Sequence, residues 1–400
     1  MTLEPQKSDW PMVALAILAG ITAAAHVGKA PPALPLLRGE LNLSIVQAGW
    51  TVSIIAAMAM ASGMAAGMTA DRIGHRRLLI IGLLIMALSG AVGSVADGPW
   101  LLLVSRFFEG VGFISVAVSA PSLIVTSIFH RHRQVVLGIW SIWVPAGMAF
   151  SMFISPLIMA PFGWRGLWVF WSVITVGLVA ALLAKPAPPT PPEAPAQPRH
   201  SYVGSLKLIF GRPGPLLMAL NFCVFATQWG SMIVWLPSFL FEQRALPVST
   251  AALLGGLVVV VNVPGNLLGS WLLHHGVRRR YLIGFAHFAM GLCAIGIFSD
   301  SLTDMTRYVL VLVFSHIAGI LPAAMFASVP VHTPTPQQFG ATNGLLLQGS
   351  NIGNFFGPPA VAAVVAAMGA WNGVLWLMLA SAGAGIALTV WLAAIENRSD

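Results

Sequence analysis

Four ionisable residues lie inside two long apolar stretches of the sequence. His26 and Lys29 are three residues apart in one stretch, and Arg106 and Glu109 are three residues apart in another. This spacing places both members of each pair on one face of a helix. A charge costs several kcal/mol in such surroundings, so the groups found there usually pair with each other, bind a ligand or carry protons. These four residues are therefore the first candidates for the chemistry of the molecule.

Each candidate also has a role that needs no ligand. Arg106 and Glu109 can neutralise each other and stiffen their helix. Lys29 lies late in its stretch and can extend its charged end out of the apolar region, and His26 can hydrogen-bond a neighbouring helix. If Arg106 and Glu109 pair, the positive groups that remain are Lys29 and, when protonated, His26. That arrangement favours an anionic ligand.

Polar residues in the second half of the chain add candidates for contact with a ligand. Gln228 and Asn351 lie within apolar stretches, and His316 is an ionisable residue in a third. Hydrogen bonds between packed helices explain most polar residues in such surroundings. We nevertheless expect these three to face a central cavity together with His26 and Lys29.

The sequence has no pattern for catalysis, nucleotide hydrolysis or metal binding. Gly28 and Lys29 lack the rest of a phosphate-binding loop, and no His-Glu-x-x-His motif occurs. The only cysteines, Cys223 and Cys293, lie in apolar stretches and indicate neither a metal site nor a disulfide. We therefore expect no enzyme, no catalytic residue, no cofactor and no metal.

The elements that position these residues are predicted to be membrane-spanning helices. Hydrophobic residues make up 57% of the 400 positions and charged residues only 8%, against roughly 25% charged residues in an average soluble domain. A helix needs about 20 apolar residues to cross a bilayer. The segments that meet this need predict an all-α membrane protein with twelve spans. They are residues 12–36, 45–70, 77–96, 99–127, 134–160, 165–184, 213–241, 249–273, 280–299, 306–330, 339–367 and 371–394.

Basic residues in the connecting segments predict the orientation. Most of them fall on the side that also carries both termini, and few fall on the other side. Because Lys and Arg favour cytoplasmic loops, we expect both termini to be cytoplasmic and the protein to lie in the cell (inner) membrane. The net charge of +8 then reflects topology and not binding to nucleic acid. The exceptions on the other side are Arg38, Arg165, Arg244 and Arg307.

One long polar connection divides the chain into two halves. Its core, residues 185–199, contains seven prolines and predicts an extended, solvated tether. We expect a six-helix domain at residues 1–184, a cytoplasmic linker at 185–212 and a second six-helix domain at 213–400.

A charged loop between the second and third predicted spans has the most specific pattern. A second copy with similar glycine and arginine spacing begins at Gly269, with Leu273 in the position of Asp71. The charged loop contains Gly67, Asp71, Arg72, Gly74, Arg76 and Arg77. The spacing of these six residues resembles the signature loop between helices 2 and 3 of the major facilitator superfamily of secondary transporters.

This resemblance implies a fold and a mechanism. The fold has twelve helices in two six-helix pseudo-repeats, with the substrate at their interface. The mechanism is alternating access, in which the loop around Asp71 locks one state. Arg106, followed by Gly110 and Gly112, is similar to a helix-4 pattern of the family, whose arginine lies near the substrate cavity and is often linked to proton coupling. We assign coupling to Glu109, His26 and Arg106.

The expected function is transport of a small solute, anionic in character, with protons as a further partner. Segments at Trp235-Leu-Pro-Ser and Gly138-Ile-Trp-Ser are similar to the cyanate-permease-like branch of the family, which moves small anions and small organic compounds. Besides the solute and protons we expect membrane lipids as partners, and a monomer.

Two other functions stay open. Gly344, Gly353 and Gly357 resemble the antiporter motif of drug exporters, but on a different helix, and Ser151 interrupts the corresponding pattern in the fifth span. This departure weakens an efflux function for organic compounds. A membrane sensor that transports nothing would need a soluble output domain, and the longest soluble stretch here is the proline-rich tether.

Overall fold

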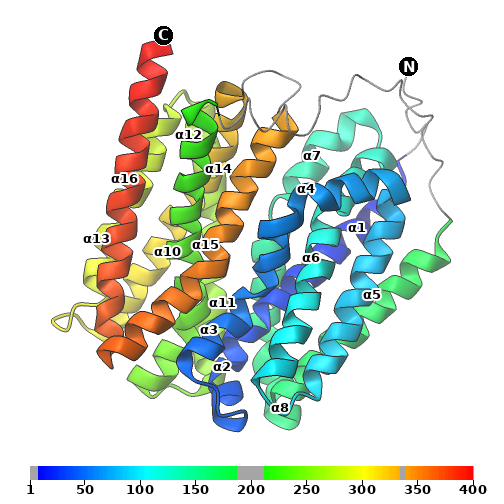
Figure 1. Cartoon of the computed structure of the whole chain (residues 1–400), viewed down its shortest axis with the longest axis horizontal. Coiled ribbons are helices and arrows are strands. Elements are labelled where there is room, and N and C mark those ends of the chain that lie inside the picture. The colour runs from blue at the N-terminus through cyan, green and yellow to red at the C-terminus, as the bar shows by residue number, and fades with distance from the viewer. Residues whose placement is uncertain (1–7, 187–210, 334–338, 400) are drawn as a thin grey trace.

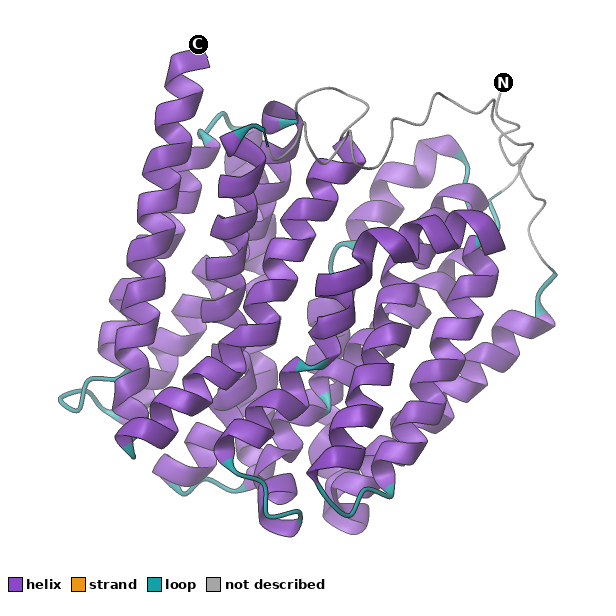
Figure 2. Ribbon diagram, in the orientation of Figure 1, coloured by secondary structure: helices purple, strands orange, loops and turns teal. Residues whose placement is uncertain are grey.

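The computed structural model describes residues 8–186, 211–333 and 339–399, with helices and no strand in those ranges (Figure 2). Ten of the described helical stretches are long and apolar enough to cross a membrane. The all-helical fold expected from the sequence is thus confirmed.

The described part of the first half forms eight helices, because three predicted spans are divided and two are joined within one helix. The span at 12–36 breaks at Lys29, in front of two prolines that cannot donate backbone hydrogen bonds. The span at 45–70 breaks near Ile54. The helices are α1 (Trp10–Gly28), α2 (Ala30–Glu40), α3 (Ile45–Ser53), α4 (Ile55–Ile73), α5 (His75–Ser94), α6 (Pro99–Ser127), α7 (His130–Trp140) and α8 (Trp143–Ala184).

Helix α8 contains parts of two predicted spans. Gly163 divides it into two legs, with φ 61° and ψ −172°, a conformation that a residue with a side chain rarely adopts. The beginning of the span predicted at 134–160 belongs to α7 instead. The sixth predicted span, 165–184, is the second leg of α8.

The second half of the chain follows the predicted order with one further division, at Val261. Its helices are α10 (Pro213–Arg244), α11 (Val248–Val260), α12 (Asn262–His274), α13 (Arg279–Ile297), α14 (Asp304–His332), α15 (Phe339–Met368) and α16 (Val374–Ser399), with a short 3-10 turn at Trp371–Gly373.

The two halves lie side by side as two bundles of helices (Figure 1). The start of α1 and the end of α16 lie at one end, at the top of Figure 1, which we call the termini end. The loops that follow α2, α5 and α15 lie at the bottom, which we call the opposite end.

Contacts between the bundles extend from the opposite end to α4, in the middle of the molecule. Helix α2 packs on α10 and α11, α3 and α4 pack on α15, and α11 packs on α8. Gly49 of α3 meets the backbone of α15, since a β-carbon there would lie 3.1 Å from Pro359 Cα. Arg38 of α2 forms an ion pair with Glu242 of α10. The two bundles are therefore joined at the opposite end by both apolar and charged contacts.

Candidate functional site

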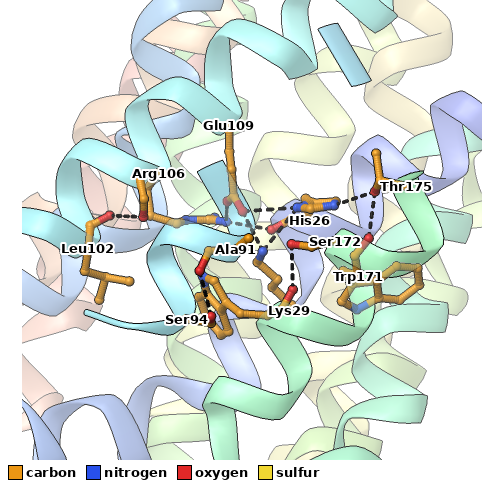
Figure 3. A network of polar contacts seen from close by, with 12 residues as sticks. His26, Lys29, Ala91, Ser94, Leu102, Arg106, Glu109, Trp171, Ser172 and Thr175 are labelled. Atoms are coloured by element: carbon orange, nitrogen blue, oxygen red, sulfur yellow. Dashed lines mark hydrogen bonds and ion pairs between the residues drawn. The ribbon is translucent and has the colours of Figure 1, made fainter. Parts of the chain in front are cut away.

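The four ionisable residues singled out from the sequence form one network inside the first bundle (Figure 3). Glu109 Oε1 accepts a hydrogen bond from Lys29 Nζ at 2.6 Å and lies 3.1 Å from His26 Nδ1. Its other oxygen, Oε2, accepts from Arg106 Nη1. All four side chains are fully buried. One carboxylate thus joins two cations and an imidazole in the interior.

Breaks in two helices place backbone carbonyls within reach of Arg106. Its Nη1 donates to His26 O at 2.7 Å, one turn before the break between α1 and α2, and its Nε donates to Thr51 O at 3.1 Å, close to the end of α3. The guanidinium therefore ties three helices of the bundle together. Its remaining nitrogen, Nη2, is buried and has no partner in the described part of the chain.

Helix α8 supplies the far side of the network. Thr175 Oγ1 donates to Trp171 O at 2.7 Å, so its oxygen is left to accept from His26 Nε2 at 2.9 Å. This assigns the ring proton of neutral His26 to Nε2 and leaves Nδ1 as an acceptor. Lys29 Nζ, 3.1 Å from Nδ1, supplies the hydrogen bond.

Residues of α8 and α5 pack closely around Lys29 and Glu109. The Lys29 ammonium lies 4.6 Å from the centre of the Trp168 ring, within range of a cation–π interaction. A β-carbon at Gly90 of α5 would lie 2.4 Å from Ser172 Oγ and 3.1 Å from Glu109 Oε1, so a side chain there would force its neighbours to move. The charged end of Lys29 therefore stays within the bundle and does not extend to a membrane surface.

The charges of the network do not cancel. With His26 neutral, Lys29 and Arg106 contribute two positive charges and Glu109 one negative charge. Besides Arg106 Nη2, the indole nitrogen of Trp168 is buried without a partner among the described residues. A buried donor without an acceptor costs about 1–3 kcal/mol. The site thus has an excess of positive charge and of hydrogen-bond donors.

The three candidates from the second half lie outside this network. Gln228 of α10 donates to Met378 O of α16 at 2.9 Å, and His316 Nδ1 lies 3.2 Å from Val261 O, at the break between α11 and α12. Asn351 donates to Leu347 O, one turn earlier in its own helix. Each is thus held by backbone of the second bundle, and their role in binding stays a prediction.

The predicted lock loop is only partly described. The side chain of Asp71 and the surroundings of Gly67 lie outside what the structure describes. Gly74 ends α4 with φ 92° and allows the turn into α5. Arg72 and Arg77 are exposed.

Arg76 has a contact that the sequence pattern did not suggest. Its Nη2 donates to Leu182 O at 2.5 Å and also to Lys185 O, at the C-terminus of α8. A cation satisfies the free carbonyls and the negative end of the helix dipole there.

Sequence reasoning missed Thr175 and Trp168. Both lie in a predicted span, and a hydroxyl in such a span is a recognisable signal. Their partners, however, lie far away in the sequence, and no spacing rule connects α8 with α1.

Comparisons with known proteins place this geometry in context. A family model described as Major Facilitator Superfamily matches residues 12–338. The putative niacin/nicotinamide transporter NiaP of Bacillus subtilis (strain 168) is 24% identical over 356 residues, covering 88% of this chain and 84% of that protein. The probable sulfoacetate transporter SauU of Cupriavidus necator is 24% identical over 361 residues, covering 85% and 83%.

Solved structures show the same fold. A bacterial homolog of the human lysosomal transporter Spinster, in an inward-facing and unoccupied conformation, has a TM-score of 0.78 at 17% identity and covers 96% of this chain and 94% of its own. The D-xylose-proton symporter has a TM-score of 0.77 at 13% identity, with 96% and 97% covered.

Proposed function

The chain belongs to the major facilitator superfamily of membrane transporters, and from the charges of its buried network we propose that it moves a small anion across the membrane by alternating access. The observation that carries the proposal is the network of His26, Lys29, Arg106 and Glu109. It has a net positive charge, and its guanidinium has a free donor. A carboxylate or sulfonate supplies the acceptor that this interior lacks, and it lowers the cost of burying the charge.

The same network suggests how a proton is coupled to the solute. Neutral His26 accepts from Lys29 through Nδ1. A proton added at Nδ1 turns this acceptor into a donor, which then faces Glu109 Oε1 at 3.1 Å. The imidazolium then donates a hydrogen bond to Glu109 Oε1 and competes with Lys29 for that oxygen. It also repels the Lys29 ammonium, which becomes available to bind an anion. We therefore propose symport of the anion with protons. A D-xylose-proton symporter among the solved structures of the same fold supports proton coupling as feasible here.

The membrane and the orientation are part of the proposal. Basic residues gather at the termini end, which favours a cytoplasmic position for that end in the cell membrane. The bundles join near the opposite end, so the described state is then closed toward the outside. We propose that residues 1–184 and 213–400 move as two domains about these contacts.

An efflux function for organic compounds receives less support. The quinolone resistance protein NorB of Staphylococcus aureus (strain JH9) is 28% identical over 152 residues, but these cover only 38% of this chain and 32% of that protein. β-Carbons at Gly353 and Gly357 would lie 2.2 Å from Cys223 O and 3.1 Å from Thr227 Cα of α10. Close helix packing therefore accounts for these glycines of the antiporter-like pattern.

A matched pair of solutes tests the charge of the substrate. Niacin carries a carboxylate and nicotinamide a neutral amide of nearly the same shape, and sulfoacetate adds a sulfonate. In proteoliposomes we expect the purified protein to exchange niacin or sulfoacetate in preference to nicotinamide. If it exchanges neither acid, niacin and sulfoacetate should inhibit exchange of another solute more strongly than nicotinamide does. Equal recognition of niacin and nicotinamide, or transport of a cation, would contradict the proposal.

A further inference from the structure

A cavity lies within the second bundle, away from the buried network of the first. It measures about 320 Å³ and is bounded by α10, α11, α13, α14, α15, the 3-10 turn and α16. Its walls are mostly aromatic and aliphatic side chains. The most prominent are Met232, Trp235, Phe239, Phe298, Trp371 and Met378.

Two arginines lie at the mouth of this cavity, at the opposite end of the molecule. Arg244 pairs with Asp304 at 3.1 Å, and Arg307 pairs with Asp300 at 3.3 Å. The carboxylates are 65% and 79% exposed, whereas the arginines are only 26% and 10% exposed. Ion pairs with such exposed carboxylates contribute little to stability. The guanidinium groups are therefore sheltered, whereas both carboxylates are largely exposed, although Asp304 also lines the cavity.

Arg307 and Ser231 also have unused hydrogen-bonding atoms. Arg307 lines the cavity, and its Nε is buried without a partner among the residues described. Ser231 lines the inner part of the cavity, and its buried hydroxyl likewise has no described partner. Arg307 Nε can therefore donate a hydrogen bond to a ligand at the mouth of the cavity, and the Ser231 hydroxyl can bond a ligand deeper inside.

Two other polar groups of the walls already have hydrogen-bond partners. Trp235 Nε1 donates to Pro358 O at 2.9 Å, and Tyr308 donates to Leu254 O at 2.9 Å. The wall between mouth and floor therefore presents apolar surface. Along α10 the lining runs from Ser231 to Arg244, a length of about 20 Å at 1.5 Å per residue.

We propose that this cavity binds an amphipathic anion, with its acidic head between Arg244 and Arg307 and its acyl chain along Trp235 and Phe239. The two guanidiniums match an acidic head in charge and offer paired donors. The long apolar slot matches a hydrocarbon chain and not a small polar solute. A free fatty acid and an anionic phospholipid share this chemistry. The site is independent of the proposed anion transport through Lys29.

This proposal is tested by isothermal calorimetry, which measures the binding of dodecanoate to the purified protein. The dodecanoate concentration is kept below that at which micelles form. We expect saturable binding that is weakened at least about ten-fold by Arg307→Gln or Arg244→Gln. Arg165→Gln is the matched control, because Arg165 pairs with Glu40 at the same end of the first bundle and lines no part of the cavity. Hexanoate should bind much more weakly than dodecanoate, and dodecyltrimethylammonium should not displace it.

Lyso-phosphatidylglycerol provides the second arm. Binding of this lipid with the same arginine dependence assigns the site to a membrane phospholipid, and binding of dodecanoate alone assigns it to a free acid; both support an amphipathic-anion site. Absence of binding for both probes overturns the proposal. So does binding that is unchanged in both arginine variants, or equal displacement by the cationic amphiphile. The hexanoate comparison uses the wild-type protein and does not depend on the folding of a variant.

Discussion

At the residue scale, the central feature is a carboxylate that serves three partners. Glu109 binds Lys29 and Arg106 and lies against His26, and all of these side chains are fully buried. Removal of one partner of a buried ion pair leaves a charge uncompensated, which typically costs about 3–5 kcal/mol. The network is therefore both a candidate binding site and a structural element of the first bundle.

A double-mutant cycle on Lys29 and Glu109 tests this dependence. We expect Glu109→Gln to lower the free energy of unfolding by about 3–5 kcal/mol, because it leaves the charges of Lys29 and Arg106 uncompensated. Lys29→Met should lower it less, because Glu109 still pairs with Arg106. The double variant should lose less than the sum, because it leaves no unmatched member of this pair. Unfolding in detergent measures the three variants against wild type. Additive losses would show that the two residues do not stabilise each other.

His26 tests the coupling of protons to the solute. In His26→Gln the amide can still donate to Thr175 and accept from Lys29, but it cannot take up a proton near neutral pH. We expect solute exchange to persist and accumulation driven by a proton gradient to be lost. Proteoliposomes with and without an imposed pH gradient measure both activities. Accumulation that persists in this variant and still collapses with a protonophore places the proton carrier elsewhere.

The residues of the network could be predicted from the sequence, but their partners could not. Charges in apolar stretches are rare, which is why His26, Lys29, Arg106 and Glu109 were recognisable. Helical spacing suggested pairs within one helix, such as Arg106 with Glu109. Helical spacing does not indicate that α1 packs against α6, so it could not predict the ion pair between Lys29 and Glu109. That contact arises from tertiary packing.

At the element scale, apolar length predicted most spans but not where helices break. The two prolines after Lys29 can be seen in the sequence, but apolar length alone predicts one continuous span there. Hydropathy measures how apolar the residues are and takes no account of the backbone N–H that proline lacks. The break near Ile54 has no proline or glycine beside it. Both breaks matter, because Arg106 binds carbonyls of α1 and α3 close to them.

Arg76 and Arg77 form a natural test of the contact between α5 and the end of α8. Arg76 binds carbonyls at the C-terminus of α8, whereas Arg77 is exposed. We expect Arg76→Ala to lower the free energy of unfolding by about 1–2 kcal/mol, since a charged donor and a helix dipole partner are both lost. Arg77→Ala should change it little. Thermal unfolding of the two variants makes the comparison. Equal effects would mean that the α8 contact is not what stabilises this loop.

At the scale of the whole molecule, two bundles meet near one end, and the fold and family expected from the sequence are confirmed. The family comprises transporters, which also confirms that the protein is not an enzyme. Membership in the cyanate-permease-like branch stays a prediction. A sequence pattern such as the loop at residues 67–77 identifies the family because glycines and charges recur at fixed spacing. The joint between bundles depends on surfaces that no such pattern marks.

Gly49 tests that joint. A β-carbon there would lie 3.1 Å from Pro359 of α15, so Gly49→Leu should force the bundles apart at the opposite end. Gly39→Leu is the matched control, because Gly39 lies at the same end with open space around it. We expect only the first variant to shift the population away from the closed arrangement.

Spin labels on cysteines introduced at Gly98 and Asp300 report this change, since these positions lie on different bundles at the opposite end. The native Cys223 and Cys293 are first replaced by alanine. A longer or broader distance distribution in Gly49→Leu, and none in Gly39→Leu, is expected. Identical distributions in all variants would show that Gly49 does not control the approach of the bundles.

Counterflow of a labelled anion measures whether Lys29 and its network bind an anion. Proteoliposomes carry wild type, Lys29→Ala, Lys29→Arg or the control Arg165→Ala. We predict that Lys29→Ala weakens the apparent affinity at least ten-fold, or about 1.4 kcal/mol. Lys29→Arg should rescue only part of it because the guanidinium differs in shape, and Arg165→Ala should match wild type. Unchanged anion affinity in a folded Lys29→Ala protein, or a transported solute that is a cation, would contradict the account.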